Sequence, residues 1–594
     1  MDAKAKSFTF LSNEGQVTIP FFQRGYVWDE DNWSDLLTDL LNSTKSHFLG
    51  SLILKQQRST TGEPKNVTVI DGQQRLTTLS ILLKALFDTF PESIREHTTI
   101  PLRNHLFFKQ YQTDAEYRVR IKHSHADEQA YTTVIRANLE GPGIDADADA
   151  TNRIVQCYNY FCRQLRARSD DERKRLFNRL LDQDQRMLVV IDLTEEDDEQ
   201  TIFDTTNTSG VRLSCADIIK NALFQRAIQL LAGKPDEAVA LYQRTWAHVF
   251  LSDDDAVAYW ETKRLTGRLQ RDNIEVLLHS IAVIKGFYDP DKHQLSDLSK
   301  LYKEQIAKLS TLNEAVAFVK EIHHYGELYR ENILSFDDST AFSYADYRQR
   351  LFHILDVLQV STFHPFILFA IKEFKNDAAK CERILSSLER FVMRRMLAKQ
   401  ETKNYNKICK DFINNPDSVI AEANNTKDEE VSNGLTAIAN KNAALVLFWV
   451  ELLRRSQDRK YDGTELKFDY SLEHIMPQKW EEHWKNIPMK HDAAGNIMEQ
   501  QEAKKDRYDK VYWLGNMTLL TSSLNSALRN YAFQKKMSGD GRKKGVKSYA
   551  SLSVTKDDIV APYESGDMEW DENKIIARTA ALGKEVSQLW GTVE

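Results

Sequence analysis

The chain has 594 residues, enough for several domains, and its 79 basic and 87 acidic residues give a formal net charge of −8. This balance excludes a protein that is basic over its whole surface, although it leaves room for a local basic groove. Because no apolar run reaches the length of a membrane span, the N-terminus lacks an apolar signal segment and the five cysteines form no Cys-x-x-Cys pair, we expect a cytoplasmic protein without a membrane or a cysteine-based zinc site.

The first part of the chain predicts a small α/β unit. Short apolar runs bounded by turn residues indicate strands, and apolar residues at helical spacing indicate helices. We expect strands at 16–20, 50–56, 66–70 and 187–193 and helices at 31–41 and 74–90.

The middle of the chain, from residue 216 to residue 453, has helical apolar spacing almost throughout and no fixed repeat. After Arg454, tryptophan, histidine and turn residues become frequent, which marks a change of composition. Helices are expected at 217–231, 274–285, 301–322, 347–358 and 381–396. We therefore predict a multidomain α+β protein that is mainly helical, with domains at 1–225, 226–455 and 456–594.

A short polar motif, Asp71 to Arg75, stands where a predicted strand ends and a predicted helix begins. Gly72 permits a tight turn, and the free amides at a helix N-terminus favour an anion such as phosphate. Arg75 is suited to phosphate oxygens, and Asp71 to a metal ion or a water molecule. The alternative is structural, with Asp71 as the helix N-cap and Arg75 as its partner. The chain has no Gly-x-x-x-x-Gly-Lys-Ser/Thr motif, so a nucleotide would be held by this turn and not by a P-loop.

A second motif holds the side chains that phosphodiester hydrolysis needs. A neutral imidazole is a good general base near pH 7, and His474 offers one. Magnesium takes oxygen ligands, and Glu473 with Asn525 supplies a carboxylate and an amide. We expect a strand at 469–472 to deliver the histidine and the carboxylate, and a helix at 522–533 to carry the amide. The structural alternative is a histidine packed in a core before a proline turn.

Basic residues follow the second motif closely. Phosphate contacts of such residues give DNA affinity that does not depend on sequence and that weakens with salt. A flexible lysine-rich loop is the alternative. The residues predicted to contact DNA are Arg529, Lys535, Lys536, Arg542, Lys543 and Lys544.

Four segments stand in order along the chain: Ile19-Pro-x-x-Gln-Arg-x-Tyr-x-Trp28, Phe48-Leu-Gly-Ser-Leu-Ile-Leu54, Ile70-Asp-Gly-Gln-Gln-Arg-Leu-Thr-Thr-Leu79 and the segment from Ile202 to Lys220. Together they resemble the N-terminal nucleotidase domain of GmrSD-type modification-dependent restriction enzymes, whose fold is similar to ParB and sulfiredoxin. The resemblance implies a domain that binds and hydrolyses a nucleoside triphosphate, with catalytic Asp71, Gln74 and Arg75. It also implies nucleotide contacts from Gln23, Arg24, Gly72, Gln73, Asn207 and Lys220. Asn207 equally suits a plain turn before a helix. The resemblance does not distinguish among GTP, ATP and UTP as the bound triphosphate.

The second motif resembles an HNH (ββα-metal) nuclease. An acidic residue and a histidine precede Ile-x-Pro, and Asn516 is followed by a second asparagine nine residues later. The resemblance implies that His474 is the general base, that Glu473 and Asn525 bind Mg²⁺ or Mn²⁺, and that Asn516 acts in catalysis by orienting the histidine or holding its loop. No cysteine pairs flank the motif, so the structural zinc of some HNH proteins should be absent.

The two resemblances together imply a type IV-like restriction endonuclease of antiphage defence. Such an enzyme would cut or nick double-stranded DNA, modified phage DNA being the expected form, and would couple cutting to triphosphate binding or hydrolysis. Two other functions stay open: a non-catalytic ParB-like module that binds DNA or nucleotide, and an unspecific nuclease toxin of abortive infection. A homodimer also stays open, and no membrane partner is expected.

Overall fold

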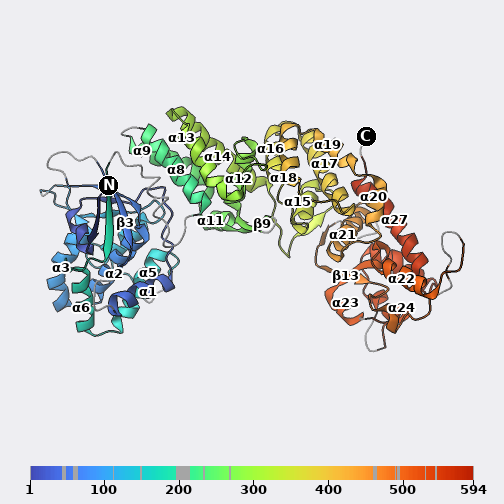
Figure 1. The fold of residues 1–594 in the computed structure, drawn as a ribbon. Coiled ribbons are helices and arrows are strands. Elements are labelled where there is room, and N and C mark those ends of the chain that lie inside the picture. Colours follow the sequence, from blue (N-terminus) through green and yellow to red (C-terminus); the bar gives the residue numbers. More distant parts are fainter. Residues whose placement is uncertain are drawn as a thin grey trace. The chain divides into compact units, whose positions relative to one another are not determined.

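The computed structural model describes the chain except for residues 1, 43–47, 58–63, 112, 147–149, 195–213, 232–233, 267–268, 459–464, 488–489, 491–494, 529, 542–544 and 593–594. Contacts divide the chain into two compact units. The N-terminal unit is Met1–Arg244 with Tyr302–Val316, and the C-terminal unit is Thr245–Leu301 with Ala317–Glu594 (Figure 1). The domain boundaries expected after residues 225 and 455 stay predictions, because compactness by contacts does not show which segments fold alone.

The N-terminal unit is built around a six-stranded mixed sheet with the order β1-β8-β3-β4-β2-β7. Its central strands, β3 (Ser51–Gln56) and β4 (Val67–Asp71), pair antiparallel. β8 (Leu188–Leu193) runs parallel to β3, and β2 (Val17–Thr18) runs parallel to β4. These four strands confirm the four expected ones, because each is an apolar run that the sheet buries.

Two edge strands, β1 (Asp2–Lys6) and β7 (Ile121–Lys122), complete the sheet and were not expected. Most β1 side chains are exposed, and β7 has only two residues, so neither strand carries an alternation of apolar and polar residues. Both strands are held by pairing, β1 with β8 and β7 with β2. Their neighbours, and not their own composition, therefore make them strands.

Helix α2 (Gln73–Thr89) follows β4 and is the central helix of the unit (Figure 1). Almost all of its side chains are buried, as expected for a helix that is surrounded by others. Its Lys84 lies inside the core and is paired with Asp88, which also accepts a hydrogen bond from Tyr158 at 2.6 Å. The other helices around the sheet are α1 (Glu30–Asn42), α3 (Glu92–Leu106), α4 (Glu128–Arg136), α5 (Arg153–Arg166) and α6 (Asp170–Leu180).

The middle of the chain is helical, as expected, but the helix predicted at 301–322 is two helices. The backbone amides of Ser310 and Thr311 donate to the Glu314 carboxylate at 2.7 and 3.1 Å, which ends one helix and starts the next. No described helix is long and apolar enough to cross a membrane. The helices of this region include α12 (Asn273–Ile284), α13 (Leu298–Ala307), α14 (Leu312–Asn332), α15 (Tyr347–Val357), α16 (His364–Glu373), α17 (Ala378–Leu397), α18 (Tyr405–Asn414), α19 (Ser418–Asn425), α20 (Asp428–Gly434) and α21 (Asn440–Gln457).

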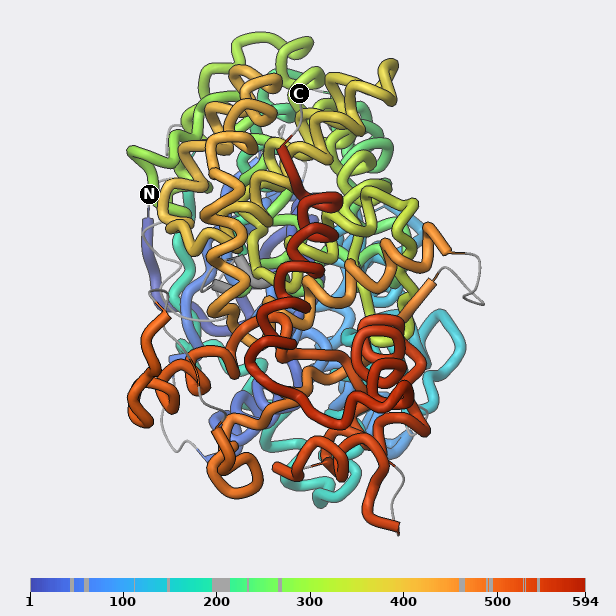
Figure 2. The backbone as a smooth tube through the Cα atoms, turned by 90° about the vertical axis from the view of Figure 1, so that its right-hand side faces the viewer, coloured from blue at the N-terminus to red at the C-terminus, as the bar shows by residue number. Residues whose placement is uncertain are grey.

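The end of the chain packs back on these helices within the C-terminal unit. α27 (Glu572–Trp590) contacts α17 and α21, and Figure 2 shows it in dark red. The Trp590 indole donates to the Glu389 carboxylate at 2.8 Å, in the interior. The segments before and after residue 455 therefore belong to the same compact unit.

The second motif lies on a pair of antiparallel strands, β13 (Tyr470–His474) and β14 (Met517–Thr521). The helix expected at 522–533 is too long: α23 (Ser522–Leu528) ends early, and α24 (Phe533–Ser538) begins after a break. The break allows the Phe533 ring to turn into the core and stack on Trp570, with 5.7 Å between the ring centroids. The order strand, strand, helix is compatible with the expected ββα-metal fold, but both this fold and the ParB-like fold stay predictions.

Candidate functional site

The first candidate site is the turn between β4 and α2. Gly72 has a φ of 92°, and a Cβ atom there would lie 2.3 Å from Leu52 Cδ2 and 2.9 Å from the Ser51 carbonyl oxygen, so a larger residue does not fit. Arg75 donates to the same carbonyl oxygen at 2.9 Å, which holds the start of α2 against β3. Asp71 is the last residue of β4 and Gly72 is the N-cap, so Asp71 does not cap the helix.

Gln74, predicted to be catalytic, is engaged in holding a neighbouring segment. Its amide nitrogen donates to the Gly25 carbonyl at 3.2 Å, and its amide oxygen accepts from the Val27 backbone amide at 2.9 Å. Both polar ends of the side chain therefore bind backbone. In this structure Gln74 positions the segment that carries Arg24, and a direct role in hydrolysis stays a prediction.

Gln73 and Gln23 complete the attachment of the same segment. Gln73 donates to the Arg24 carbonyl at 3.2 Å, and Gln23 donates to the Val69 carbonyl at 3.1 Å. The amide oxygen of Gln73 is buried and has no hydrogen-bond partner among the residues that the structure describes. A buried polar atom of this kind normally has a partner, so it suits a ligand with a hydrogen-bond donor.

Charged side chains from three segments gather near the turn. Lys220, on α8 (Cys215–Leu230), donates to Asp217 at 2.8 Å and is almost fully buried. Burial would raise the pKa of Asp217, but the charges of Lys220 and Arg24 and a bond from the Ser214 hydroxyl hold it below its usual value. Burial raises the pKa of Asp71, and a hydrogen bond from the Gly72 amide with the charges of Arg75 and Arg24 only partly offsets this. The predicted residues Arg24, Asp71 and Lys220 thus lie in one electrostatic environment.

A cavity of about 570 Å³ adjoins this group within the N-terminal unit. Its walls come from β2, β4, β7, α8 and α9 (Pro235–Tyr242). Gln23 lines it directly, and Ile218 and Asn221 line it from positions next to Asp217 and Lys220. Lys55 and Lys122 supply positive charge at its wall. A volume in this range suits a small ligand of nucleotide size.

The second candidate site is centred on His474, which is 8% exposed. Its Nδ1 atom donates to the Val511 carbonyl at 3.1 Å, so in the neutral ring Nε2 carries the lone pair. Burial lowers the pKa of His474, the hydrogen bond to the Val511 carbonyl partly offsets this, and the charge of Lys536 lowers the pKa further, which favours the neutral ring near pH 7. Nε2 lies 3.2 Å from Asn440 Oδ1, a contact that the neutral ring accepts when the Asn440 amide is turned to present its nitrogen.

Asn516, fully buried at the end of the turn η5 (Leu514–Asn516) that precedes β14, makes four hydrogen bonds with its side chain. Its amide nitrogen donates to the Met476 and Val511 carbonyls, both at 2.9 Å. Its amide oxygen accepts from the Met476 amide at 2.9 Å and from the Trp570 indole at 3.1 Å. Since all of these partners are structural, Asn516 holds the loop after His474 and does not face a substrate.

The predicted metal ligands Glu473 and Asn525 lie beside the histidine. Burial raises the pKa of Glu473, while the Lys536 ammonium, 2.5 Å from its Oε1 atom, lowers it. The Asn525 amide nitrogen donates to Ser471 Oγ at 3.0 Å and to the Leu472 carbonyl at 2.8 Å, so its oxygen is the atom that a cation would take. A carboxylate and an amide oxygen are donors of the type that Mg²⁺ prefers.

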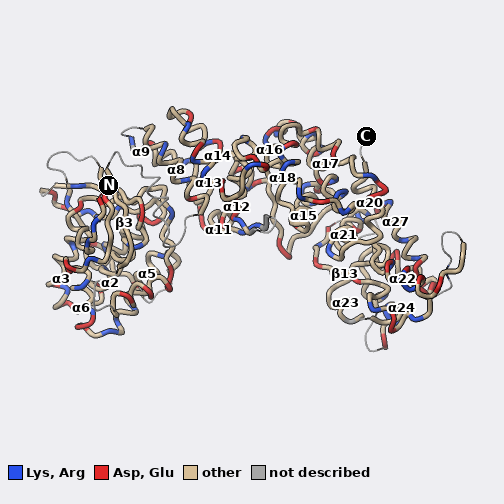
Figure 3. Tube along the Cα trace, viewed as in Figure 1, with Lys and Arg blue, Asp and Glu red and all other residues tan. Residues whose placement is uncertain are grey.

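The structure corrects the assignment of Lys536 to a DNA-binding surface. Its side chain is 1% exposed, and its ammonium donates to Glu473 and, at 2.8 Å, to the His474 carbonyl. Lys535 is exposed and lies over the Tyr531 ring, so a phosphate contact from it stays a prediction. Figure 3 shows acidic and basic residues interspersed along the chain, in agreement with its small net charge. The predicted residues Asn207, Arg529, Arg542, Lys543 and Lys544 lie outside the described residues.

Three residues at these sites were missed by the reasoning from sequence. Asp217 precedes the predicted Lys220 by one helical turn, and this spacing is a signal that would have found it. Asn440 and Trp570 lie far from the second motif along the chain, and no local pattern marks them. Only the packing of α21 and of the segment before α27 brings them to His474 and Asn516.

Comparison with protein families gives two matches. The model described as the GmrSD restriction endonuclease, N-terminal domain, matches residues 8–224, and that of the GmrSD restriction endonucleases, C-terminal domain, matches residues 423–585. The first segment holds the β4–α2 turn and most of α8, and the second holds β13, β14 and the residues around His474. Together the two segments cover more than half of the chain. A comparison with curated proteins finds no match.

Proposed function

Because the chain belongs to the GmrSD family of restriction endonucleases, we propose that it cuts or nicks DNA by HNH-type hydrolysis at His474. The observation that carries this is the state of the histidine. Its Nδ1–H is fixed by the Val511 carbonyl and burial lowers the pKa of the ring, so Nε2 carries the lone pair of a base. Nε2 faces Asn440, which is exposed, and a substrate would reach this atom once the Asn440 side chain moves aside.

Each side chain around His474 has its own role in the proposed hydrolysis. Nε2 accepts a proton from the attacking water after Asn440 turns aside. Glu473 and Asn525 would hold Mg²⁺ or Mn²⁺, which would neutralise charge at the scissile phosphate. Lys536 fixes the Glu473 carboxylate from the inside and leaves its second oxygen for the metal. Asn516 holds the loop after His474 in place through its bond from the Met476 amide.

We further propose that the N-terminal unit binds and hydrolyses a nucleoside triphosphate. Arg24, Lys220 and Arg75 are cations near the start of α2, and the amides of a helix N-terminus add to the attraction for phosphate. The adjoining cavity is large enough for a base and ribose. Apart from the cavity lining, the buried Gln73 oxygen offers an acceptor at the start of α2. Asp71, whose pKa is raised by burial, would position a water or a metal ion beside the phosphates. None of the described residues that line the cavity selects among GTP, ATP and UTP.

The physiological substrate would be modified phage double-stranded DNA, and the role antiphage defence. The test is a cleavage assay of the purified protein on matched modified and unmodified DNA, with Mg²⁺ and with or without each triphosphate. We expect cutting of modified DNA that is lost in His474→Ala and retained in His483→Ala, whose histidine is exposed.

Two other outcomes of this assay would each favour an alternative function. Equal cutting of all DNA would favour an unspecific nuclease toxin. Absence of cutting under every condition, together with binding of DNA or nucleotide, would favour a non-catalytic ParB-like module. Triphosphate hydrolysis is measured in the same samples, so that the two activities are judged separately.

A further inference from the structure

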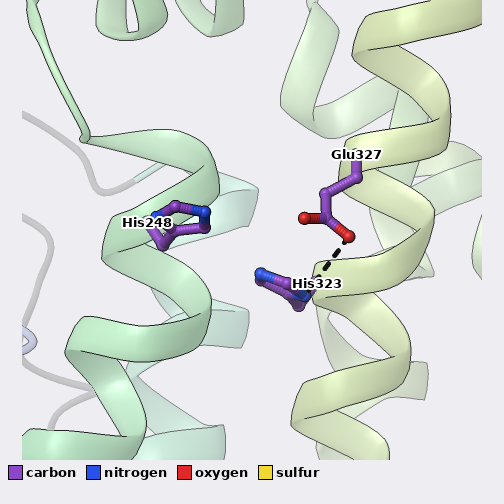
Figure 4. Close-up of side chains that lie close together, drawn as sticks. All are labelled: His248, His323 and Glu327. Atoms are coloured by element: carbon purple, nitrogen blue, oxygen red, sulfur yellow. Dashed lines mark ion pairs between the residues drawn. The ribbon is translucent and has the colours of Figure 1, made fainter.

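Two histidines and a glutamate meet between helices of the C-terminal unit, in a part of the chain that neither family model matches. His248 starts α10 (His248–Phe250), directly after a π-helical turn, η2 (Gln243–Ala247). His323 and Glu327 stand one helical turn apart on α14. Figure 4 shows these two side chains facing the helix that carries His248. One potential ligand atom from each residue lies within 4.8 Å of the others.

The polar atoms of this group are poorly satisfied by protein partners. His323 Nε2 is buried and has no hydrogen-bond partner among the described residues. The Glu327 carboxylate has one ion-pair partner in the described part of the chain, His323 Nδ1 at 3.7 Å, and no lysine or arginine. Glu321, on the same helix, is by contrast paired with Lys285 and Lys372. His323 Nε2 lacks the partner that a buried polar atom normally has, and the Glu327 carboxylate, whose side chain is 43% exposed, has no basic partner among the described residues, so this group suits a cation.

We propose that His248, His323 and Glu327 bind a divalent transition metal ion such as Zn²⁺. Two imidazoles and one carboxylate are the donor set that Zn²⁺ takes when it keeps a fourth position for water. The set differs from the oxygen donors Glu473 and Asn525, because imidazole nitrogen favours transition metals over Mg²⁺. The metal would join the η2–α10 segment to α14, two segments that are distant along the chain.

The geometry needs small side-chain rotations and no backbone movement. Ligand atoms around Zn²⁺ lie about 3.3 Å apart for bonds of about 2.0 Å. His323 Nδ1 lies 3.7 Å from Glu327 Oε2, which is already close to this, so Nδ1 is the His323 atom that the metal would take beside Glu327. The two imidazole rings are stacked, with centroids 5.7 Å apart and an interplanar angle of 27°, so one ring must turn to bring its nitrogen to the metal. His248 is exposed and has room to turn.

The test is titration of the chelator-treated, full-length protein with Co²⁺, whose visible absorption reports nitrogen ligands. The experiment uses wild type and Asn525→Ala, which removes a ligand of the metal proposed at Glu473 and Asn525, so that this metal cannot account for the signal. We expect one Co²⁺ site with nitrogen ligands in both proteins and competition by Zn²⁺. Affinity should fall at least about ten-fold in His323→Gln and in Glu327→Gln. The matched control is His324→Gln, the exposed neighbour on the same helix, which should bind as wild type does.

Glu327→Gln keeps the shape of the side chain, so this variant tests the site even if His323→Gln folds poorly. Circular dichroism verifies that the Glu327→Gln protein is folded. Unchanged Co²⁺ affinity in a folded Glu327→Gln protein would overturn the proposal. A signal that disappears in Asn525→Ala but persists in the His323 and Glu327 variants would overturn it too, and would place the metal at Glu473 and Asn525. Neither result depends on DNA cutting, so this inference and the proposed function fail separately.

Discussion

His474 and Asn516 donate hydrogen bonds to the same acceptor, the carbonyl oxygen of Val511, at 3.1 and 2.9 Å. Because Asn516 fixes this carbonyl and the loop after the histidine, it determines which nitrogen of His474 carries the proton. Asn516 was expected either to orient the histidine or to hold its loop. The same hydrogen bonds of Asn516 serve both roles. Asn516 is a positioning residue, and its effect on hydrolysis is indirect.

Asn516→Ala should slow DNA cutting by about 100-fold, with little change in the KM for DNA. The variant leaves buried partners without a hydrogen bond, so we also expect the free energy of unfolding to fall by about 1–3 kcal/mol. Steady-state cleavage and urea unfolding measure the two effects. Asn433→Ala, at an exposed position on α20, is the matched control and should change neither. Wild-type kcat in a folded Asn516→Ala protein would contradict this role.

Lys536→Met and Lys535→Met should behave differently although the residues are neighbours. Lys536 is paired with Glu473 in the interior, and removing one partner of a buried pair costs about 3–5 kcal/mol, so this variant should be destabilised and should lose cutting. Lys535 is exposed, so its variant should keep the stability of wild type. If Lys535 contacts a phosphate, the slope of log affinity against log salt should fall by about 0.9. A stable and active Lys536→Met protein would show that the pair with Glu473 is unimportant.

Asp71→Asn should abolish triphosphate hydrolysis without lowering stability. Burial disfavours the charged form of Asp71, so replacing the carboxylate with a neutral amide relieves a desolvation cost. Gln74→Ala should instead lower the free energy of unfolding by about 1–3 kcal/mol, because the Gly25 carbonyl and the Val27 amide lose their partner. Hydrolysis assays and thermal unfolding of both variants separate the two roles. If Asp71→Asn hydrolyses as wild type does, Asp71 has no place in the reaction.

His353→Phe should make the protein less sensitive to acid. His353 stacks on Phe342 with 4.2 Å between the ring centroids, and burial lowers its pKa to about 3 from 6.5. The folded state keeps this ring neutral while the unfolded chain takes up a proton. The stability that His353 contributes is therefore complete above pH 6.5 and is lost progressively as the pH falls toward 3.

Between pH 6.5 and pH 5 the loss of stability in wild type should exceed that in His353→Phe by about 2 kcal/mol. Urea unfolding followed by tryptophan fluorescence at the two pH values measures it. His97→Gln, at an exposed site, should follow wild type. Equal pH dependence in wild type and His353→Phe would mean that the ring is protonated in the folded protein.

Local pattern was sufficient for the elements whose own side chains decide their structure. The buried strands β3, β4 and β8 and the helices α1 and α2 follow from runs and spacings of apolar residues. The two polar motifs likewise show their chemical components directly, since the residue types are visible in the chain. The family that the motifs resemble is the one whose models match.

Tertiary packing decided everything that depends on a distant partner. β1 and β7 are strands because β8 and β2 pair with them, and Lys536 is buried because Glu473 lies opposite. Asn440 and Trp570 reach the second motif from segments that are distant along the chain. His248 meets His323 only through the packing of two helices. The physical reason is common to all of these. A local pattern reports whether a side chain prefers the interior, whereas its partner there is chosen by contacts between segments that the chain order does not bring together.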